Sequence, residues 1–248
     1  MKILFEIAFV GTAYHGFQVQ PELPTVQGSV QSALEELYGT KLSVSGCSRT
    51  DAGVHARQFF VTAEGDIKNA PPPGVIPIVA RRYLPDDIAI LSAREVADTF
   101  HVRYDVEYKE YRYVISNSRV LSPFDAKRAF HYPQALDHTL MTDAARAIVG
   151  RQDFAAFMAQ GSAITDTVRE VKYCYAEREG DYVTIVVAAD GFLYNMVRII
   201  SGTLVDVCAG RIDKNAVRDI ILSKNRALAG QTLPPDGLYL NRVVYKGL

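Results

Sequence analysis

The chain has 248 residues, of which 48% are hydrophobic and 22% are charged, and its formal net charge at pH 7 is −1. These proportions are typical of a folded globular protein and exclude a disordered or fibrous chain. No apolar run reaches the roughly 18 to 20 residues that a membrane-spanning helix needs, and the first residues do not resemble a signal peptide, so we expect a cytoplasmic protein. The near-neutral charge does not by itself indicate nucleic-acid binding.

The three cysteines, Cys47, Cys174 and Cys208, are odd in number and far apart. This usage predicts reduced thiols instead of a disulfide framework or a zinc cluster, and it favours a buried small residue over a nucleophile at Cys47. The sequence contains no His-x-x-x-His, Cys-x-x-Cys or glycine-rich nucleotide loop. We therefore expect neither a metal nor a cofactor.

The first part of the chain alternates between strand and helix patterns. Thr25 can cap a helix that carries apolar residues on one face, and Gly39 lies just past the predicted end of this helix. A proline-rich connector at 69–74 precedes a second, short helix at 75–83. Apolar alternation predicts strands at 2–10, 41–47, 58–64 and 88–96. The order of elements is βαββαβ.

The second part of the chain repeats this order with one additional helix. Gly180 and Asp181 supply a tight turn between two of its strands. The predicted strands are 107–115, 168–178, 182–189 and 238–245, and the predicted helices are 137–149, 192–208 and 213–222.

The order of strands and helices thus occurs twice in the chain. This repeat predicts an α+β protein made of two pseudo-duplicated, ferredoxin-like βαββαβ halves. We expect the halves to join into a mixed, mainly antiparallel sheet, with helices on one face and a central active-site cleft. The predicted domains are residues 1–104 and residues 105–248.

The stretch at 48–56 places Asp51 in a loop between two predicted strands, beside the small residues Ala52 and Gly53. A lone aspartate in a loop is usually a turn residue or a helix cap, although small neighbours also let a ligand approach closely. Arg198 lies within an otherwise apolar helical pattern, and a buried arginine requires a partner. Asp51 is a candidate partner, and the alternative is that Arg198 extends to solvent at the edge of the helix.

Lys109, Tyr111 and Tyr113 share one face of a predicted strand. Such a row can be a stacking platform for bases, worth roughly 1 to 3 kcal/mol per base, but tyrosines on strands more often belong to ordinary sheet packing. Arg103 lies among aromatic residues, which suits a phosphate or carboxylate contact, and a surface ion pair is the alternative.

The sequence resembles the TruA family of tRNA pseudouridine synthases over nearly its whole length. The most specific match is the octet Arg-Thr-Asp-Ala-Gly-Val-His-Ala at 49–56. The other matching segments follow the family's order and lie at 11–21, 25–27, 84–88, 100–103, 111–113, 153–157 and 195–198.

This resemblance implies isomerisation of uridine in tRNA, at positions 38–40 of the anticodon arm, by a homodimer without cofactor or metal. It makes Asp51 the catalytic residue and Tyr111 the active-site tyrosine over the uracil. It also implies that Arg198 pairs with Asp51, that Arg49 helps to hold the target base out of the stack, and that Arg103 lies near the RNA.

Three alternatives remain at this point. The protein could modify a different RNA, it could bind RNA without catalysis, or it could be a small-molecule hydrolase with an aspartate nucleophile. The intact set of Asp51, Tyr111 and Arg198 disfavours the second alternative, and the lack of a water-activating partner disfavours the third. The sequence leaves open whether Asp51 attacks C1′, attacks C6 or abstracts a ribose proton.

Overall fold

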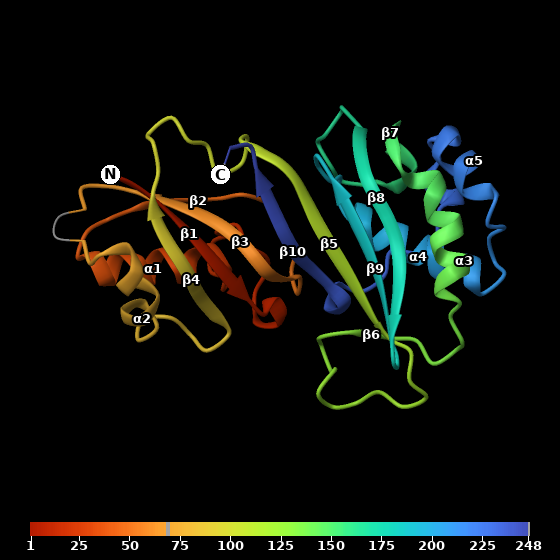
Figure 1. Cartoon of the computed structure of the whole chain (residues 1–248), viewed down its shortest axis with the longest axis horizontal. Helices are drawn as coiled ribbons and strands as arrows, with labels where there is room; N and C mark the ends of the chain where they lie inside the picture. The colour runs from red at the N-terminus through yellow and green to blue at the C-terminus, as the bar shows by residue number, and fades with distance from the viewer. Residues whose placement is uncertain (68–69, 248) are drawn as a thin grey trace. The chain divides into compact units, whose positions relative to one another are not determined.

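The computed structural model describes residues 1–67 and 70–247, and this part of the chain contains ten strands and five α-helices (Figure 1). Unit 1 comprises Met1–Glu107 and Leu240–Leu248, and unit 2 comprises Tyr108–Tyr239. The chain passes from unit 1 to unit 2 within strand β5 and returns within strand β10. The predicted connector at 69–74 begins at Asn69, which lies outside the described residues.

The sheet of unit 1 is built around β1, which is antiparallel to β3 on one side and to β4 on the other. Phe5, in the middle of β1, pairs with Val61 of β3 and with Ala93 of β4, and its side chain is fully buried. The short strand β2 pairs with the end of β3, and β10 lies next to β3. The bounds are β1 Lys2–Phe9, β2 Ser43–Gly46, β3 His55–Glu64, β4 Ile88–Glu95 and β10 Leu238–Tyr245.

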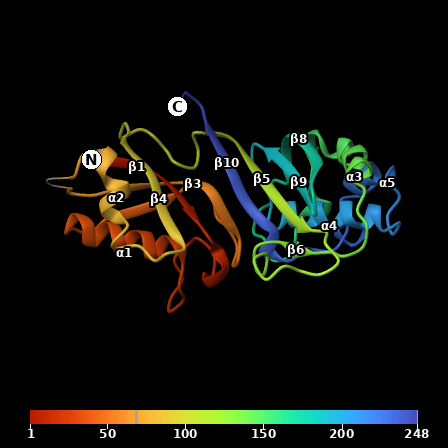
Figure 2. The same ribbon diagram turned by 60° about the horizontal axis from the view of Figure 1, so that its bottom comes forward.

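Both helices of unit 1, α1 (Val26–Tyr38) and α2 (Ile76–Ala80), lie on one face of this sheet (Figures 1 and 2). Helix α1 has the predicted bounds, because the Thr25 side chain accepts a hydrogen bond from the Gly28 amide at 3.3 Å and Gly39 ends the helix with a φ of 64°. Helix α2 is shorter than predicted. The βαββαβ order of the first half is confirmed.

The sheet of unit 2 has the strand order β5-β9-β8-β7, and all of these neighbours are antiparallel. Strand β6 (Phe130–His131) lies parallel to β5, which makes the sheet mixed. The sequence patterns did not predict β6 or β7, because runs of two and four residues are too short to show alternation. The other bounds are β5 Val106–Ser116, β7 Gly150–Asp153, β8 Val168–Glu179 and β9 Tyr182–Ala189.

Helix α4 (Met196–Cys208) forms the core of unit 2, with α3 (His138–Ala145) and α5 (Ala216–Ser223) as the other helices. Eleven of the thirteen residues of α4 are buried. Arg198 is the one charged residue of this helix that is not buried. The prediction that this helix begins at Phe192 is wrong. Asn195 has a left-handed φ of 60°, which separates the apolar residues before it from the helix.

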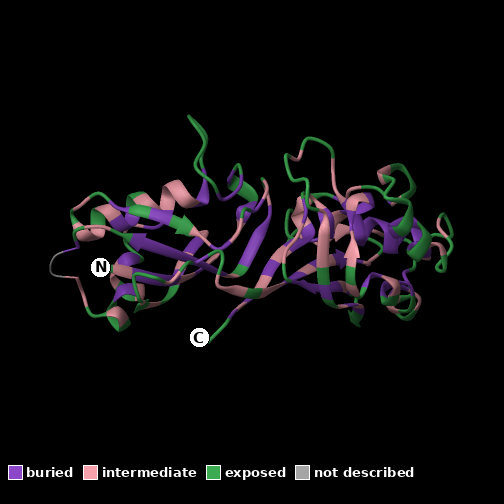
Figure 3. Cartoon of the chain, turned by 90° about the horizontal axis from the view of Figure 1, so that it is seen from above, coloured by how far each residue is buried: buried purple, intermediate pink, exposed green. Residues whose placement is uncertain are grey.

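Each unit therefore combines a mainly antiparallel sheet with helices, which confirms the predicted α+β class. Figure 3 shows the buried residues concentrated in the strands and the exposed residues mostly in the connecting loops. Within unit 2 the Tyr113 side chain, at the middle of β5, is fully buried and donates a hydrogen bond to the Pro234 carbonyl at 2.8 Å. The strands thus supply the framework on which the loops of each unit are held.

The position of α4 depends on a close backbone approach at Gly202. A Cβ atom there would lie 1.9 Å from the Gln231 carbonyl oxygen. We expect Gly202→Ala to lower the free energy of unfolding by about 1 to 3 kcal/mol, because the neighbouring segment would have to move. Urea denaturation measures this change. In the control Gly74→Ala, where nothing lies within 4 Å of the added atom, the change should be below about 0.5 kcal/mol; equal losses in both variants would contradict the explanation.

Candidate active site

Asp51 lies in the loop between β2 and β3 and is half-buried. Its carbonyl oxygen accepts a hydrogen bond from the Val54 amide at 3.2 Å, and Gly53 has a left-handed φ of 80°. The local geometry is therefore the turn that a lone aspartate favours. Strand β3 begins directly after this turn, at His55 and not at Gln58 as predicted.

The turn that contains Asp51 is held by residues 11–17, a segment we call the glycine loop. The Phe17 amide donates to the Thr50 carbonyl at 3.1 Å, and the Gly53 amide donates to the Tyr14 carbonyl at 3.3 Å. These two hydrogen bonds lie on either side of Asp51 in the sequence. The backbone of the turn therefore has partners both before and after the carboxylate.

Only glycine fits at two positions where the glycine loop touches the turn. A Cβ atom at Gly11 would lie 1.9 Å from the Val54 carbonyl oxygen, and one at Gly16 would lie 2.6 Å from the Thr50 carbonyl oxygen. Gly16 also has a φ of 91°, which other residues adopt only with strain. The two segments are thus in backbone-to-backbone contact.

His55 joins the same two segments through its side chain. It is 1% exposed, and its Nδ1 accepts a hydrogen bond from the Gly11 amide at 3.0 Å. Because an amide can only donate, Nδ1 is unprotonated and the neutral ring carries its proton on Nε2. The histidine of the octet thus holds the Asp51 turn against the glycine loop.

Tyr14 fixes the other side of the glycine loop. Its hydroxyl donates to Asp87 Oδ1 at 2.5 Å, and the Asp87 carbonyl accepts the Val10 amide at 2.9 Å. Burial, together with this hydrogen bond, raises the pKa of Tyr14, which keeps the hydroxyl a donor. The sequence analysis matched this loop to a family but did not predict that Gly11, Tyr14 and Gly16 support the Asp51 turn. The only sequence signal for this role was a pair of glycines in a loop rich in aromatic residues.

The structure brings Arg49 and Arg103 together in unit 1. Both side chains are exposed and line one cavity of about 240 Å³. Arg103 does not form the surface ion pair that was its alternative interpretation, since no carboxylate lies within 4 Å of it among the described residues. Instead its guanidinium lies 5.8 Å from the centre of the Tyr104 ring.

Tyr111 and Tyr113, on β5 in unit 2, have different surroundings. Tyr111 is 6% exposed, and the Phe192 ring meets it edge-to-face at a centroid distance of 4.9 Å. Tyr113 is fully buried, and burial raises its pKa. The prediction of an open stacking platform that includes Tyr113 is therefore wrong. Tyr113 belongs to the ordinary packing of the sheet. The role of Tyr111 stays a prediction.

Arg198 is oriented by its own unit. Its Nε donates to the Leu233 carbonyl and its Nη1 donates to Asn195 Oδ1, both at 2.6 Å. These bonds hold the guanidinium in place instead of leaving it extended into solvent. The expected pairing with Asp51, a residue of unit 1, stays a prediction.

The cysteines have the surroundings expected of structural residues. Cys47 is fully buried, as predicted, and its Sγ accepts the Phe60 amide at 3.4 Å. Burial raises the pKa of Cys174 to about 12, which makes it a poor nucleophile. Across residues 1–67 and 70–247, no three His, Cys, Asp or Glu side chains are grouped to hold a metal ion. The same part of the chain has no helix with the length and apolar character needed to cross a membrane.

We expect His55→Leu to lower the free energy of unfolding by about 1 to 3 kcal/mol, because the buried Gly11 amide loses its acceptor. The loss in His55→Asn should be smaller, since its side-chain oxygen can take the place of Nδ1. Urea denaturation measures both changes, and hydrogen exchange of the Gly11 amide locates them. If that amide exchanged as slowly in His55→Leu as in the unchanged protein, the assigned role of His55 would be wrong.

Comparison with known proteins identifies the family. The family model described as tRNA pseudouridine synthase matches residues 7–105 and 144–246. A protein named tRNA pseudouridine synthase A from Thermoanaerobacter sp. (strain X514) is 40% identical over 244 residues, which cover 98% of this chain and 99% of the relative. A protein of the same name from Acetivibrio thermocellus is 42% identical and covers 99% of both chains.

Among solved structures, a Cbf5-Nop10-Gar1 complex matches 96% of this chain and 49% of the solved chain, with 13% identity and a TM-score of 0.38. A likeness at this level adds nothing to the assignment. The sequence comparisons are sufficient, because they extend over nearly the whole chain at about 40% identity. The chain belongs to the TruA family of tRNA pseudouridine synthases.

Proposed function

We propose that this protein isomerises uridine to pseudouridine in tRNA and that Asp51 is the catalytic residue. The observation that supports this assignment is the fixed presentation of Asp51, between two backbone hydrogen bonds from the glycine loop, in a chain of this family. A catalytic group must be held in a defined geometry, and loops fixed on a sheet commonly provide it. Asp51 is half-buried, so part of the residue remains accessible.

The reaction breaks the bond between C1′ and N1, turns the uracil and joins it again through C5. A carboxylate can take a covalent or an electrostatic role in this sequence. The target base must first leave its stack, at a cost of a few kcal/mol. In our proposal Arg49 helps to hold the base out and Tyr111 recovers part of this cost by packing against the uracil.

Arg198 completes the proposed set by pairing with Asp51. A guanidinium favours the ionised form of a neighbouring carboxylate and fixes its direction. The hydrogen bonds of Arg198 to Leu233 and Asn195 limit the orientations that it can adopt. Since Asp51 belongs to the proposed domain 1–104, whereas Tyr111 and Arg198 belong to 105–248, we expect neither domain to be active alone.

We further propose the anticodon arm of tRNA as the target, a homodimer as the active form and the cytoplasm as the location. A family member with another RNA target is the alternative. Mapping of pseudouridines in tRNA and rRNA from cells with and without the gene distinguishes the two. Loss of modification confined to rRNA would exclude the anticodon arm.

Asp51→Asn removes the charge and the nucleophilic oxygen with almost no change of volume. We expect the rate of pseudouridine formation to fall at least about a thousand-fold, as for loss of a central catalytic group. The rate is measured by release of tritium from tRNA labelled at C5 of uracil, and RNA binding should remain. The exposed carboxylate of Asp98 supplies the control Asp98→Asn, which should be fully active. An active Asp51→Asn enzyme would refute the assignment.

Arg198→Lys keeps a positive charge but loses the planar fork of donors. We expect the rate at saturating tRNA to fall by roughly 10- to 100-fold with little change of the dissociation constant for tRNA, because the loss affects the orientation of Asp51. Single-turnover kinetics and filter binding separate these quantities. Arg218→Lys on the exposed surface of α5 is the matched control. A variant that loses only affinity would place Arg198 in RNA binding instead.

A further inference from the structure

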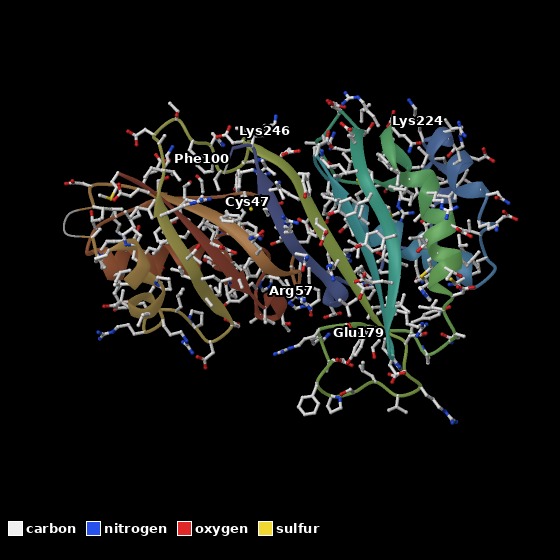
Figure 4. All side chains as sticks on the ribbon, in the orientation of Figure 1. Cys47, Arg57, Phe100, Glu179, Lys224 and Lys246 are labelled. Carbon is white, nitrogen blue, oxygen red and sulfur yellow. The ribbon has the colours of Figure 1, made fainter. Side chains whose placement is uncertain are left out.

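The Asp51 turn lies between Cys47 and Arg57, which are both labelled in Figure 4. The Cys47 amide donates to the Phe60 carbonyl of β3 at 2.9 Å, so the segment leaves the sheet after this point and rejoins it in β3. Between these two points the backbone of the turn bonds to the glycine loop. The position of the turn therefore depends on the contacts that hold the glycine loop itself.

Asp87, directly before β4, contacts the residues on both sides of the 3₁₀ turn Gly11–Ala13, with which the glycine loop begins. Its carbonyl accepts the Val10 amide at 2.9 Å, and its carboxylate accepts the Tyr14 hydroxyl at 2.5 Å. Strand β4 is antiparallel to β1, the strand that leads into the glycine loop. Asp87 is therefore placed by the sheet, and this one residue holds both ends of the 3₁₀ turn.

Tyr14 joins Asp87 to the Asp51 turn. Its hydroxyl donates to Asp87, and its carbonyl accepts the Gly53 amide at 3.3 Å, two residues after Asp51. Tyr14 thus bonds to the start of β4 through its side chain and to the Asp51 turn through its backbone. A change at the Tyr14 hydroxyl is transmitted to the turn through this one residue and one further hydrogen bond.

The second half of the glycine loop is held separately, by helix α1. The Val26 amide donates to the Gly16 carbonyl at 3.2 Å, and the Gln27 amide donates to the Phe17 carbonyl at 2.9 Å. The first amides of a helix have no partner within the helix, so these carbonyls satisfy them. Asp87 supplies the corresponding support for the first half of the loop.

The Tyr14 hydroxyl is suited to this role because it is buried and its acceptor is a carboxylate. Tyr14 is 7% exposed, and burial, together with the hydrogen bond to Asp87, raises its pKa, so the hydroxyl remains a donor. Hydrogen bonds to a carboxylate are shorter and stronger than those between neutral groups. Ser29, in the first turn of α1, also hydrogen-bonds with this hydroxyl. Removal of one oxygen atom therefore releases the Tyr14 ring from both neighbours.

We propose that Tyr14 and Asp87 are positioning residues for pseudouridine formation, which fix the glycine loop and, through it, the backbone of the Asp51 turn. This inference rests on the proposed function. A misplacement of a reacting group by about 1 Å can lower a rate by roughly 100-fold. Loss of the hydrogen bond between Tyr14 and Asp87 therefore slows the chemical step and leaves the affinity for tRNA unchanged.

The test compares Tyr14→Phe with the unchanged full-length protein in single-turnover pseudouridine formation with excess enzyme. The rate constant should fall roughly ten-fold, whereas the Kd for tRNA should change by less than about two-fold. A merely structural loss would lower the amplitude of the reaction, which reports the folded fraction, and not the rate constant. Thermal unfolding confirms that the variant is folded at the assay temperature. An unchanged rate constant, or a loss of affinity alone, would overturn the proposal.

Variants of Asp87 test the other partner. Asp87→Leu removes the acceptor with little change of volume and should slow the reaction as Tyr14→Phe does. Asp87→Asn keeps an oxygen that can accept the hydroxyl, so its rate should remain within about three-fold of the unchanged protein. The double variant Tyr14→Phe/Asp87→Leu should be no slower than the slower single variant, because both changes remove the same contact. A loss equal to the product of the two single losses would overturn the proposal.

Two matched controls use the same chemistry away from the glycine loop. Tyr173→Phe removes a hydroxyl that donates to Glu110 Oε2 at 2.7 Å in unit 2. Asp86→Asn changes the exposed carboxylate next to Asp87, which pairs with Arg81. Both variants should keep the rate constant of the unchanged protein. A ten-fold loss in either control would show that the effect is not specific to the contact with the glycine loop.

Hydrogen exchange of the Gly53 amide tests the path to the turn, because this amide donates to the Tyr14 carbonyl. Its exchange should be faster in Tyr14→Phe and unchanged in Tyr173→Phe. Equal exchange in Tyr14→Phe and the unchanged protein would overturn the proposal. If the unchanged protein formed no pseudouridine, the proposed function would be refuted, whereas a fully active Tyr14→Phe enzyme would refute only the positioning role.

Discussion

The Asp51 turn depends on one contact, the backbone pairing between the glycine loop at 11–17 and residues 50–54 of the turn itself. Buried amides and carbonyls must find partners, and at this contact they find them in each other. The missing side chains at Gly11 and Gly16 let the two backbones approach, and the His55 ring closes the contact. The backbone on either side of Asp51 is thus held by residues some forty positions earlier in the chain.

Arg198 in unit 2 is also held by hydrogen bonds to a segment distant in the sequence. Helix α4 is buried on almost all sides, and a charged side chain on such a helix is tolerated only if its hydrogen bonds are satisfied. The Leu233 carbonyl supplies one of them, and that segment is placed by its approach to Gly202. In each unit a candidate site residue thus lies in a segment that is held by a distant part of the chain, and a glycine lies at the contact.

This dependence explains which features the sequence could predict. Helix α1 was predicted with its correct bounds, because its signals, Thr25 and Gly39, lie within the helix ends. The start of α4 was missed, because a left-handed Asn195 breaks an apolar run that otherwise continues a helical pattern. The candidate site residues came from the motifs of a family, whereas the contacts that support them join segments that no local pattern connects. Tyr113 shows the limit of periodicity, since it shares a strand face with Tyr111 but is fully buried.

Net charge is a poor guide to the partner of this protein. The chain is nearly neutral, which by itself gives no reason to expect a polyanion. The charges are unevenly placed, however: one cavity is lined by arginines without carboxylates, and another by three acidic residues. Phosphate contacts act over about one Debye length, roughly 10 Å, so local charge decides where RNA binds. A neutral total reduces non-specific attraction to other nucleic acids.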